Sequence, residues 1–214
     1  METQPFGAGG NLIPVNPNQG FTMEMDQIFT ETRNRYLNQF IEVLTKLEAD
    51  GQRAAAEAAF RNEQGGLAEE GTLSLPLRGD IFVIKDGQPT ESMSVDSEAM
   101  FSFEPLSVVF GDDLPVEIAP FYWDACNISV SGISEQADWS LLVMWFAKWF
   151  DFEDRGNIDG EGFLGVVHFL SDPKFDGSKT EFQVDFGSAP VESFKELLDT
   201  LKASGATKVQ IGGT

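Results

Sequence analysis

Two short segments decide the fold, Phe163-Leu164-Gly165-Val166-Val167-His168-Phe169-Leu170 and Phe182-Gln183-Val184-Asp185-Phe186. Both are rich in β-branched and aromatic residues, which favour strands, and Asp176-Gly177 between them is typical of a two-residue hairpin turn. A turn at that place fixes the register of an antiparallel hairpin and pairs Val167 with Phe186, His168 with Asp185, and Phe169 with Val184. We therefore expect Phe186 on a buried face and the His168–Asp185 pair on an exposed polar face of the sheet.

The segments around this hairpin alternate between strand and helix patterns. A strand at 127–131 and an apolar helix at 134–151 precede it, and an amphipathic helix at 191–201 and a strand at 208–211 follow it. The resulting order, βαββαβ, resembles the split βαβ or ferredoxin-like arrangement over residues 124–212. Because many unrelated proteins share that arrangement, the resemblance implies a fold and no function.

The N-terminal half carries different patterns. Apolar residues recur at helical spacing from Met25 to Leu47, and an alanine-rich segment at 52–62 predicts a second helix. Turn signals then separate four short strand patterns, at 81–84, 100–103, 107–110 and 116–118.

The chain divides into a flexible arm (1–22), a helical segment (23–66), an antiparallel strand meander (67–123) and the βαββαβ unit (124–214). Together these parts predict one compact α+β body. The helix at 136–150 is apolar nearly all round, so we expect its second side to be covered by the N-terminal half or by a second subunit.

The composition excludes several classes of protein. The 214 residues include 35 Asp and Glu against 14 Lys and Arg, and the net charge of -21 argues against nucleic acid as a partner, because phosphate contacts need clustered cations. The sequence shows no basic leader and no apolar run of membrane-spanning length, so we expect a cytoplasmic protein without membrane contact. A single cysteine, Cys126, and a single histidine, His168, leave no disulfide framework and no Cys-rich metal site, and we predict no cofactor.

Few residues could serve in catalysis. Ser129, His168 and Asp185 suggest a catalytic triad, but in the usual strand order the strand of Asp185 lies between the other two, whereas a triad needs the imidazole in the middle. A cross-strand polar pair is the plainer interpretation of His168 and Asp185. Cys126 stands at the start of an apolar strand, where we expect a buried, inert thiol.

The acidic loop at 151–161 has the oxygen-rich composition that suits Ca²⁺, with five candidate ligands in Asp151, Glu153, Asp154, Asp159 and Glu161. An EF-hand aligned on Gly160 would place Arg155 and Val166 at two ligand positions, so the match fails at both ends. We favour a solvated turn and predict no metal site, and weak Ca²⁺ binding at this loop stays open.

The charge distribution is the most informative feature. All charged residues between Lys85 and Lys148 are acidic, and aromatic residues stand among them. One interpretation is a solvated acidic surface, and the other is a docking face for a basic partner, with aromatic anchors ringed by carboxylates. The residues that we assign to such a face are Glu104, Asp112, Asp113, Glu117, Trp123 and Asp124.

Two functions from different classes fit these features. The first is an acidic, non-catalytic binding protein of a bacterial cytoplasm, similar in its charge to immunity proteins and DNA mimics, which would neutralise a basic protein such as a toxin. The alternative is a small carboxylate- or metal-dependent hydrolase that uses the 151–161 loop or His168 and Asp185. The scarcity of His and Cys favours the first, and the sequence leaves the oligomeric state open.

Overall fold

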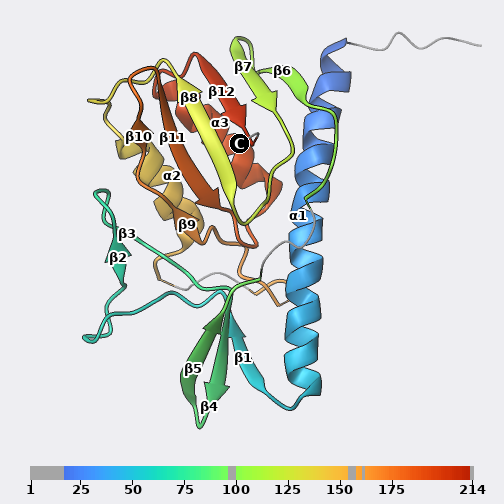
Figure 1. Ribbon diagram of the computed structural model, residues 1–214, viewed down its shortest axis with the longest axis vertical. Coiled ribbons are helices and arrows are strands. Elements are labelled where there is room, and N and C mark those ends of the chain that lie inside the picture. Colours follow the sequence, from blue (N-terminus) through green and yellow to red (C-terminus); the bar gives the residue numbers. More distant parts are fainter. Residues whose placement is uncertain (1–16, 96–99, 154–157, 161, 213–214) are drawn as a thin grey trace, which may run out of the picture.

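The computed structural model describes residues 17–95, 100–153, 158–160 and 162–212, with side chains from residue 24 onward. Within these ranges the chain forms the helices α1 (Pro17–Ala49), α2 (Ser140–Phe150) and α3 (Val191–Ala203), together with short strands in mixed sheets (Figure 1). The protein therefore belongs to the α+β class, as the sequence predicts. None of the helices in the described part of the chain is long and apolar enough to cross a membrane.

The larger sheet has seven strands in the order β10-β11-β8-β12-β7-β6, and β9 pairs with β11 beside this path. Its strands are β6 (Leu106–Phe110), β7 (Leu114–Ile118), β8 (Cys126–Ser131), β9 (Phe169–Leu170), β10 (Lys174–Phe175), β11 (Lys179–Asp185) and β12 (Lys208–Ile211). The β7–β12 pair is parallel, and the other pairs are antiparallel. Helices α2 and α3 lie behind the sheet in Figure 1, which leaves its front face open.

A second sheet lies at the other end of the molecule. It consists of β1 (Arg53–Ala56), β4 (Ile81–Lys85) and β5 (Gln88–Met93), and β2 (Glu69–Glu70) pairs separately with β3 (Leu75–Pro76). Helix α1 runs along the length of the molecule and contacts both β1 and α3, so it joins the two ends (Figure 1).

The expected segments do not map one to one onto these sheets. Strands β6 and β7 come from the expected meander, yet they extend the sheet that contains β8, β11 and β12. Of the expected arm (1–22), residues 17–22 belong to α1, and residues 1–16 lie outside the described part of the chain.

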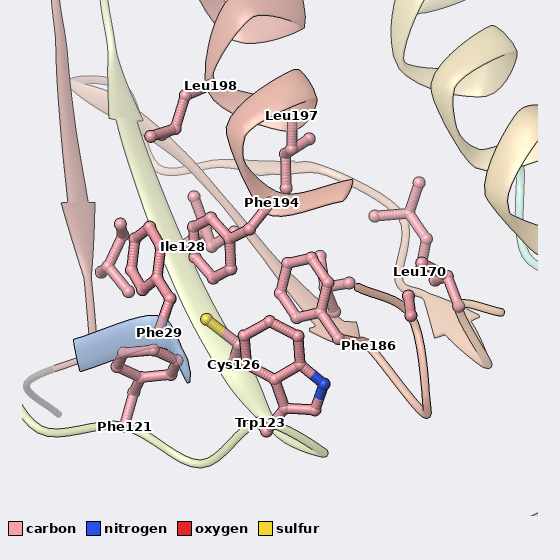
Figure 2. Packing of buried hydrophobic residues seen from close by; sticks show 14 of the residues in the cluster. Phe29, Phe121, Trp123, Cys126, Ile128, Leu170, Phe186, Phe194, Leu197 and Leu198 are labelled. Atoms are coloured by element: carbon pink, nitrogen blue, oxygen red, sulfur yellow. The ribbon is translucent and has the colours of Figure 1, made fainter. Parts of the chain in front are cut away.

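Aromatic rings form the centre of the core beneath α3 (Figure 2). The ring of Phe194 stacks between Phe29 of α1 and Phe186 at the end of β11, with centroids 4.2 and 4.5 Å apart. All three side chains are 0% exposed. The burial of Phe186 and the amphipathic character of α1 and α3 were both predictable from apolar spacing.

The alanine-rich segment at 52–62 does not form the helix that its composition predicts. Gly51, with a positive φ of 72°, follows α1, and the next residues form β1. Ala54 pairs with Val83 and Ala55 with Phe82 of β4. Helix propensities differ by less than about 1 kcal/mol per residue, so the pairing of a strand and the burial beside it override them.

The hairpin forms, but its register differs from the predicted one, by two residues at β10 beside the turn and by one residue at β9. Phe169 lies opposite Asp185, and Leu170 lies opposite Val184. The prediction set His168 opposite Asp185, which is wrong. Leu170 therefore faces the core, where it is 3% exposed.

The turn of this hairpin explains the shift. Asp176 Oδ1 accepts hydrogen bonds from the backbone N–H groups of Ser178 and Lys179, at 2.9 and 2.8 Å. An aspartate that bonds to the backbone two and three residues further on stabilises a longer loop than a two-residue turn. Phe175 pairs with Thr180 across it.

Of the strand predicted at 163–170, only the last two residues, which form β9, pair with a neighbouring strand. Gly165 has a positive φ of 72°, and its N–H and that of Val166 donate to Ser188 Oγ. Their donors are therefore satisfied outside the sheet, and this part of the segment does not continue the ladder.

Two further expected boundaries are wrong. Helix α2 begins at Ser140 and not at 134, and Asp138 Oδ1 accepts the N–H of Ser140 at 2.9 Å. Residues 100–103 form no strand, and the two Phe rings of this segment pack on each other with centroids 5.6 Å apart.

The outer side of α2 is not covered by the N-terminal half in the described part of the chain. Leu141 and Met144 on this side are 40% and 66% exposed. The N-terminal half does contact the C-terminal end of the helix, where the Arg78 guanidinium lies 4.6 Å from the centroid of the Phe150 ring. A second subunit on the exposed side stays a prediction.

Candidate functional site

His168 lies at the centre of a buried cluster of ionisable groups, and not on an exposed sheet face as predicted. Its side chain is 0% exposed. Nε2 lies 2.8 Å from Glu57 Oε1, and Nδ1 lies 2.9 Å from Asp80 Oδ1 and 3.7 Å from Asp185 Oδ2. The expected neighbour Asp185 is thus the most distant of three carboxylates, and the other two come from the N-terminal half.

Glu57 enters the cluster because the chain turns sharply after β1. The residue has a positive φ of 56° and is 0% exposed. Its carboxylate also accepts the backbone N–H groups of Ser188, at 3.1 Å, and Leu164, at 2.6 Å. One side chain therefore ties the β1 end to two C-terminal segments.

Asp80 and Asp185 are held by equally specific contacts. Asp80 precedes β4 and accepts the Tyr36 hydroxyl of α1 at 2.9 Å and the N–H of Val95 at 2.6 Å. Asp185 ends β11, and its Oδ1 accepts the N–H of Gly187 at 2.8 Å. These hydrogen bonds hold both carboxylates in position without a ligand.

The electrostatics of the cluster favour a charged imidazole. Burial alone would lower the pKa of His168, but the charge of Asp185 and the hydrogen bonds to Asp80 and Glu57 raise that pKa to about 10. Burial would raise the pKa of Glu57 and Asp80, yet their bonds to His168 outweigh it and lower both values.

For the two remaining groups of the cluster, Asp185 and Tyr36, burial is the largest cause of the shift in pKa. Burial raises the pKa of Asp185 to about 7 against the opposing charge of His168. Burial, together with the nearby carboxylates, also raises the pKa of Tyr36.

Arg78 and Gly187 close the space around the imidazole. The Arg78 guanidinium donates to the backbone carbonyls of Phe150, Glu57 and Asp151. The backbone N–H of Arg78 donates to the His168 carbonyl. A Cβ atom on Gly187 would lie 2.3 Å from the imidazole ring. The ring is therefore packed directly against backbone.

This geometry does not assemble a catalytic triad. Both ring nitrogens of His168 face carboxylates, and Ser129 lies on β8 opposite Glu181 and Gln210 instead. Cys126 is 0% exposed, as expected, and its sulfur points among the rings below α3 (Figure 2). Burial raises the pKa of this thiol, so it is a poor nucleophile.

The acidic residues assigned to a docking face do not gather in one place. Glu104 is exposed before the start of β6, whereas Asp112 and Asp113 are exposed in the turn after its end. Asp113 pairs with Lys202 at 2.6 Å, and Glu117 pairs with Lys208 at 2.7 Å.

The other two assigned residues belong to the interior or its margin. Trp123 is 0% exposed and donates its indole N–H to the Gly187 carbonyl, so its assignment as an exposed anchor is wrong. Asp124 is half-buried, and its charge contributes to the raised pKa of Asp185.

The acidic loop at 151–161, for which weak Ca²⁺ binding stayed open, is described only in part. Asp154 and Glu161 lie outside the described residues. Asp159 Oδ1 accepts the N–H of Phe163, and the carbonyl of Asp151 accepts from Arg78. These contacts hold the two ends of the loop in place.

The open face of the larger sheet is polar, as the alternation of residues along its strands predicts. A row of paired residues crosses β11, β8, β12 and β7: Glu181, Ser129, Gln210 and Glu117. A cavity of about 380 Å³ lies on this face, with Asn127, Lys174 and Lys179 also in its lining. Lysine and carboxylate side chains both line it, so it is not an acidic site.

Sequence reasoning missed Glu57, Asp80, Tyr36 and Gly187. Glu57 lay inside a segment interpreted as a helix, and Asp80 and Tyr36 belong to elements distant in sequence from His168. A spacing pattern reports neighbours on one element and does not report contacts between elements. The only local signal was Gly187 directly after a buried strand, which is typical of close backbone approach.

No known protein family, curated protein or solved structure matches this chain.

Proposed function

We propose that the protein acts by binding, as an acidic, non-catalytic inhibitor of the immunity type that neutralises a basic protein partner. The observation that carries this proposal is the burial of the chain's only histidine and only cysteine, each 0% exposed, while carboxylates lie on the surface. Acid–base and nucleophilic catalysis need groups that a substrate can reach. A net charge of -21 instead supplies a field that attracts a positively charged protein.

The turn between β6 and β7 is the docking point that we propose. Asp112 and Asp113 are exposed there, and together with Asp199 of α3 they act on the charge of Lys202. Three carboxylates act on the one ammonium of Lys202, which leaves a local excess of negative charge around that side chain. Such an excess steers a basic partner and raises its association rate.

A carboxylate- or metal-dependent hydrolase is the second candidate. Asp80, His168 and Asp185 favour it, because one ligand atom from each lies within 4.8 Å of the others. The complete burial of His168 weighs against turnover at this place. We therefore rank it below binding.

The proposal extends to the fold and the setting. The order β9-β11-β8-β12, with each neighbouring pair antiparallel, supports a ferredoxin-like unit over residues 124–212. The cytoplasmic and bacterial setting and the toxin-like nature of the partner remain predictions from the sequence.

Affinity capture tests the proposed function. Immobilised protein, exposed to an extract of the organism that encodes it, should retain a basic protein at low salt and release it at high salt. The control is a variant in which Asp112 and Asp113 are both changed to Lys, which should retain less. Retention of acidic or neutral partners alone, or hydrolysis of a small substrate that is lost in His168→Ala, would contradict the proposal.

A further inference from the structure

Three side chains from separate parts of the chain bring metal-ligand atoms together. Asp80 precedes β4, His168 precedes β9, and Asp185 ends β11. A carboxylate oxygen of each aspartate and an imidazole nitrogen all lie within 4.8 Å of one another. The two aspartates are 9% and 21% exposed and the histidine is 0% exposed, so this is a buried cluster and not a surface group of acids.

Glu57 orients the imidazole for metal binding. Its Oε1 lies 2.8 Å from Nε2 and also accepts the N–H of Ser188. A carboxylate oxygen in this position keeps a proton on Nε2. Without a metal ion the charged ring also carries a proton on Nδ1, on the side of Asp80 and Asp185, and loss of that proton frees the Nδ1 lone pair for a metal. Histidines that bind metal are commonly held in this way by a carboxylate on the opposite nitrogen.

Asp185 supplies a second, independent observation. Its Oδ1 accepts the N–H of Gly187, and its Oδ2 is the oxygen that pairs with His168. Oδ2 lies 3.7 Å from His168 Nδ1, which is too far for a hydrogen bond. Two ligands that each lie about 2.1 Å from one ion are separated by roughly 3.0–3.5 Å, so a small movement would let both reach it.

The negative charge of the cluster also favours the binding of a cation. Three carboxylates, those of Glu57, Asp80 and Asp185, face one imidazole in a region that excludes most water. Buried carboxylates are costly unless a cation balances them, and a divalent ion does so better than one proton.

We propose that Asp80 Oδ1, His168 Nδ1 and Asp185 Oδ2 bind a divalent transition-metal ion of the Zn²⁺ type. One nitrogen and two oxygens form a ligand set that suits Zn²⁺. The ion displaces any proton on Nδ1, and the proton on Nε2 stays with Glu57. Because the ligands come from both halves of the chain, the ion links the segment before β4 to the start of β9 and the end of β11. This site is independent of the proposed partner binding.

The single histidine makes the test specific. In protein labelled with ¹⁵N-histidine, the imidazole nitrogens observed by NMR belong to His168 alone. After treatment with a chelator, one equivalent of Zn²⁺ should move the Nδ1 resonance to that of a metal-bound nitrogen, while Nε2 keeps its proton. An unchanged Nδ1 resonance in excess Zn²⁺ would overturn the proposal, whatever binds to surface carboxylates.

Equilibrium dialysis of two matched variants adds the stoichiometry. Asp185→Asn retains the Oδ1 acceptor for Gly187 and should weaken the binding of one Zn²⁺ per chain by about ten-fold or more. Glu181→Gln removes a carboxylate from the exposed face of the same strand and should leave that binding unchanged. Equal weakening in both variants would overturn the site. If Asp185→Asn does not fold, the titration of the wild-type protein decides alone.

Discussion

Gly187 is the position where a single methyl group should do most damage. Its φ is 49°, and an added Cβ would lie 2.3 Å from the His168 ring and 2.6 Å from the Val166 carbonyl. We expect Gly187→Ala to lower the free energy of unfolding by about 2–5 kcal/mol, from overpacking and backbone strain together. Urea unfolding measures this difference.

The matched control is Gly177→Ala in the hairpin loop. Gly177 has a φ of 94°, but nothing lies within 4 Å of the position of an added Cβ. Only backbone strain applies, and the loss should be about 1–2 kcal/mol. Equal losses in the two variants would show that the imidazole does not press against this backbone.

Phe186 should contribute through packing alone. Its side chain is 0% exposed, and the centroid of its ring lies 4.5 Å from that of Phe194 and 4.8 Å from that of Trp123. Phe186→Ala should therefore cost about 3–5 kcal/mol of unfolding free energy in a denaturant titration. Phe175→Ala, at a position 38% exposed, should cost far less. A small loss at Phe186 would contradict the core described for this end of β11.

For single residues, the sequence predicted which side chains are apolar and face the core better than it predicted the burial of polar side chains. Alternation along the strand identified Phe186 as buried and brought Asp185 close to His168. It assigned His168 to solvent, because the side chains that cover it, from Glu57 and Asp80, stand more than eighty residues away. Burial of a polar residue depends on such distant partners, and no local pattern reports them.

Among the elements, α1 is attached to α3 by an aromatic stack and by the ion pair between Asp26 and Lys195, at 2.7 Å. Phe29 stacks on Phe194 at 4.2 Å and meets Phe121 edge-on at 6.0 Å. We expect Phe29→Ala to lower the unfolding free energy by about 3–5 kcal/mol. Gln27→Ala, at an exposed position of the same helix, is the control.

Two spectroscopic probes test whether α1 folds with the sheet. Far-UV circular dichroism reports mainly the helices, and fluorescence reports the four tryptophans, of which Trp123 and Trp145 are buried in the core. The two transitions of Phe29→Ala should coincide, because α1 contacts elements at both ends of the molecule. A separate, earlier loss of helix would contradict that role.

The elements that were predictable share one property. Helices α1 and α3 and strands β4, β7, β8 and β12 show their period in the sequence itself, so apolar spacing identified them. The 52–62 segment has strong helix formers but no apolar stripe, and pairing with β4 decided its conformation. The hairpin register failed for a related reason, since one Asp176 side chain lengthened the turn.

For the molecule as a whole, the excess of negative charge should oppose compaction. Thirty-five acidic residues face 14 basic ones, and only some of them form ion pairs. Salt shortens the Debye length from about 10 Å at 0.1 M to about 3 Å at 1 M and so screens this repulsion. We expect the unfolding midpoint in urea to rise with NaCl concentration. A fall would mean that ion pairs such as Lys202–Asp113 outweigh the repulsion.

The most direct test of binding by charge is the association rate of the captured basic partner at several salt concentrations. Association should slow steeply as salt rises, while dissociation changes less. At low salt, the variant with Asp112→Lys and Asp113→Lys should associate about ten-fold more slowly than the wild type or more. A variant with Glu69→Lys and Glu70→Lys carries the same net charge at the other end of the molecule and should change the rate far less. An association rate that is insensitive to salt, or equal in the two variants, would contradict the account.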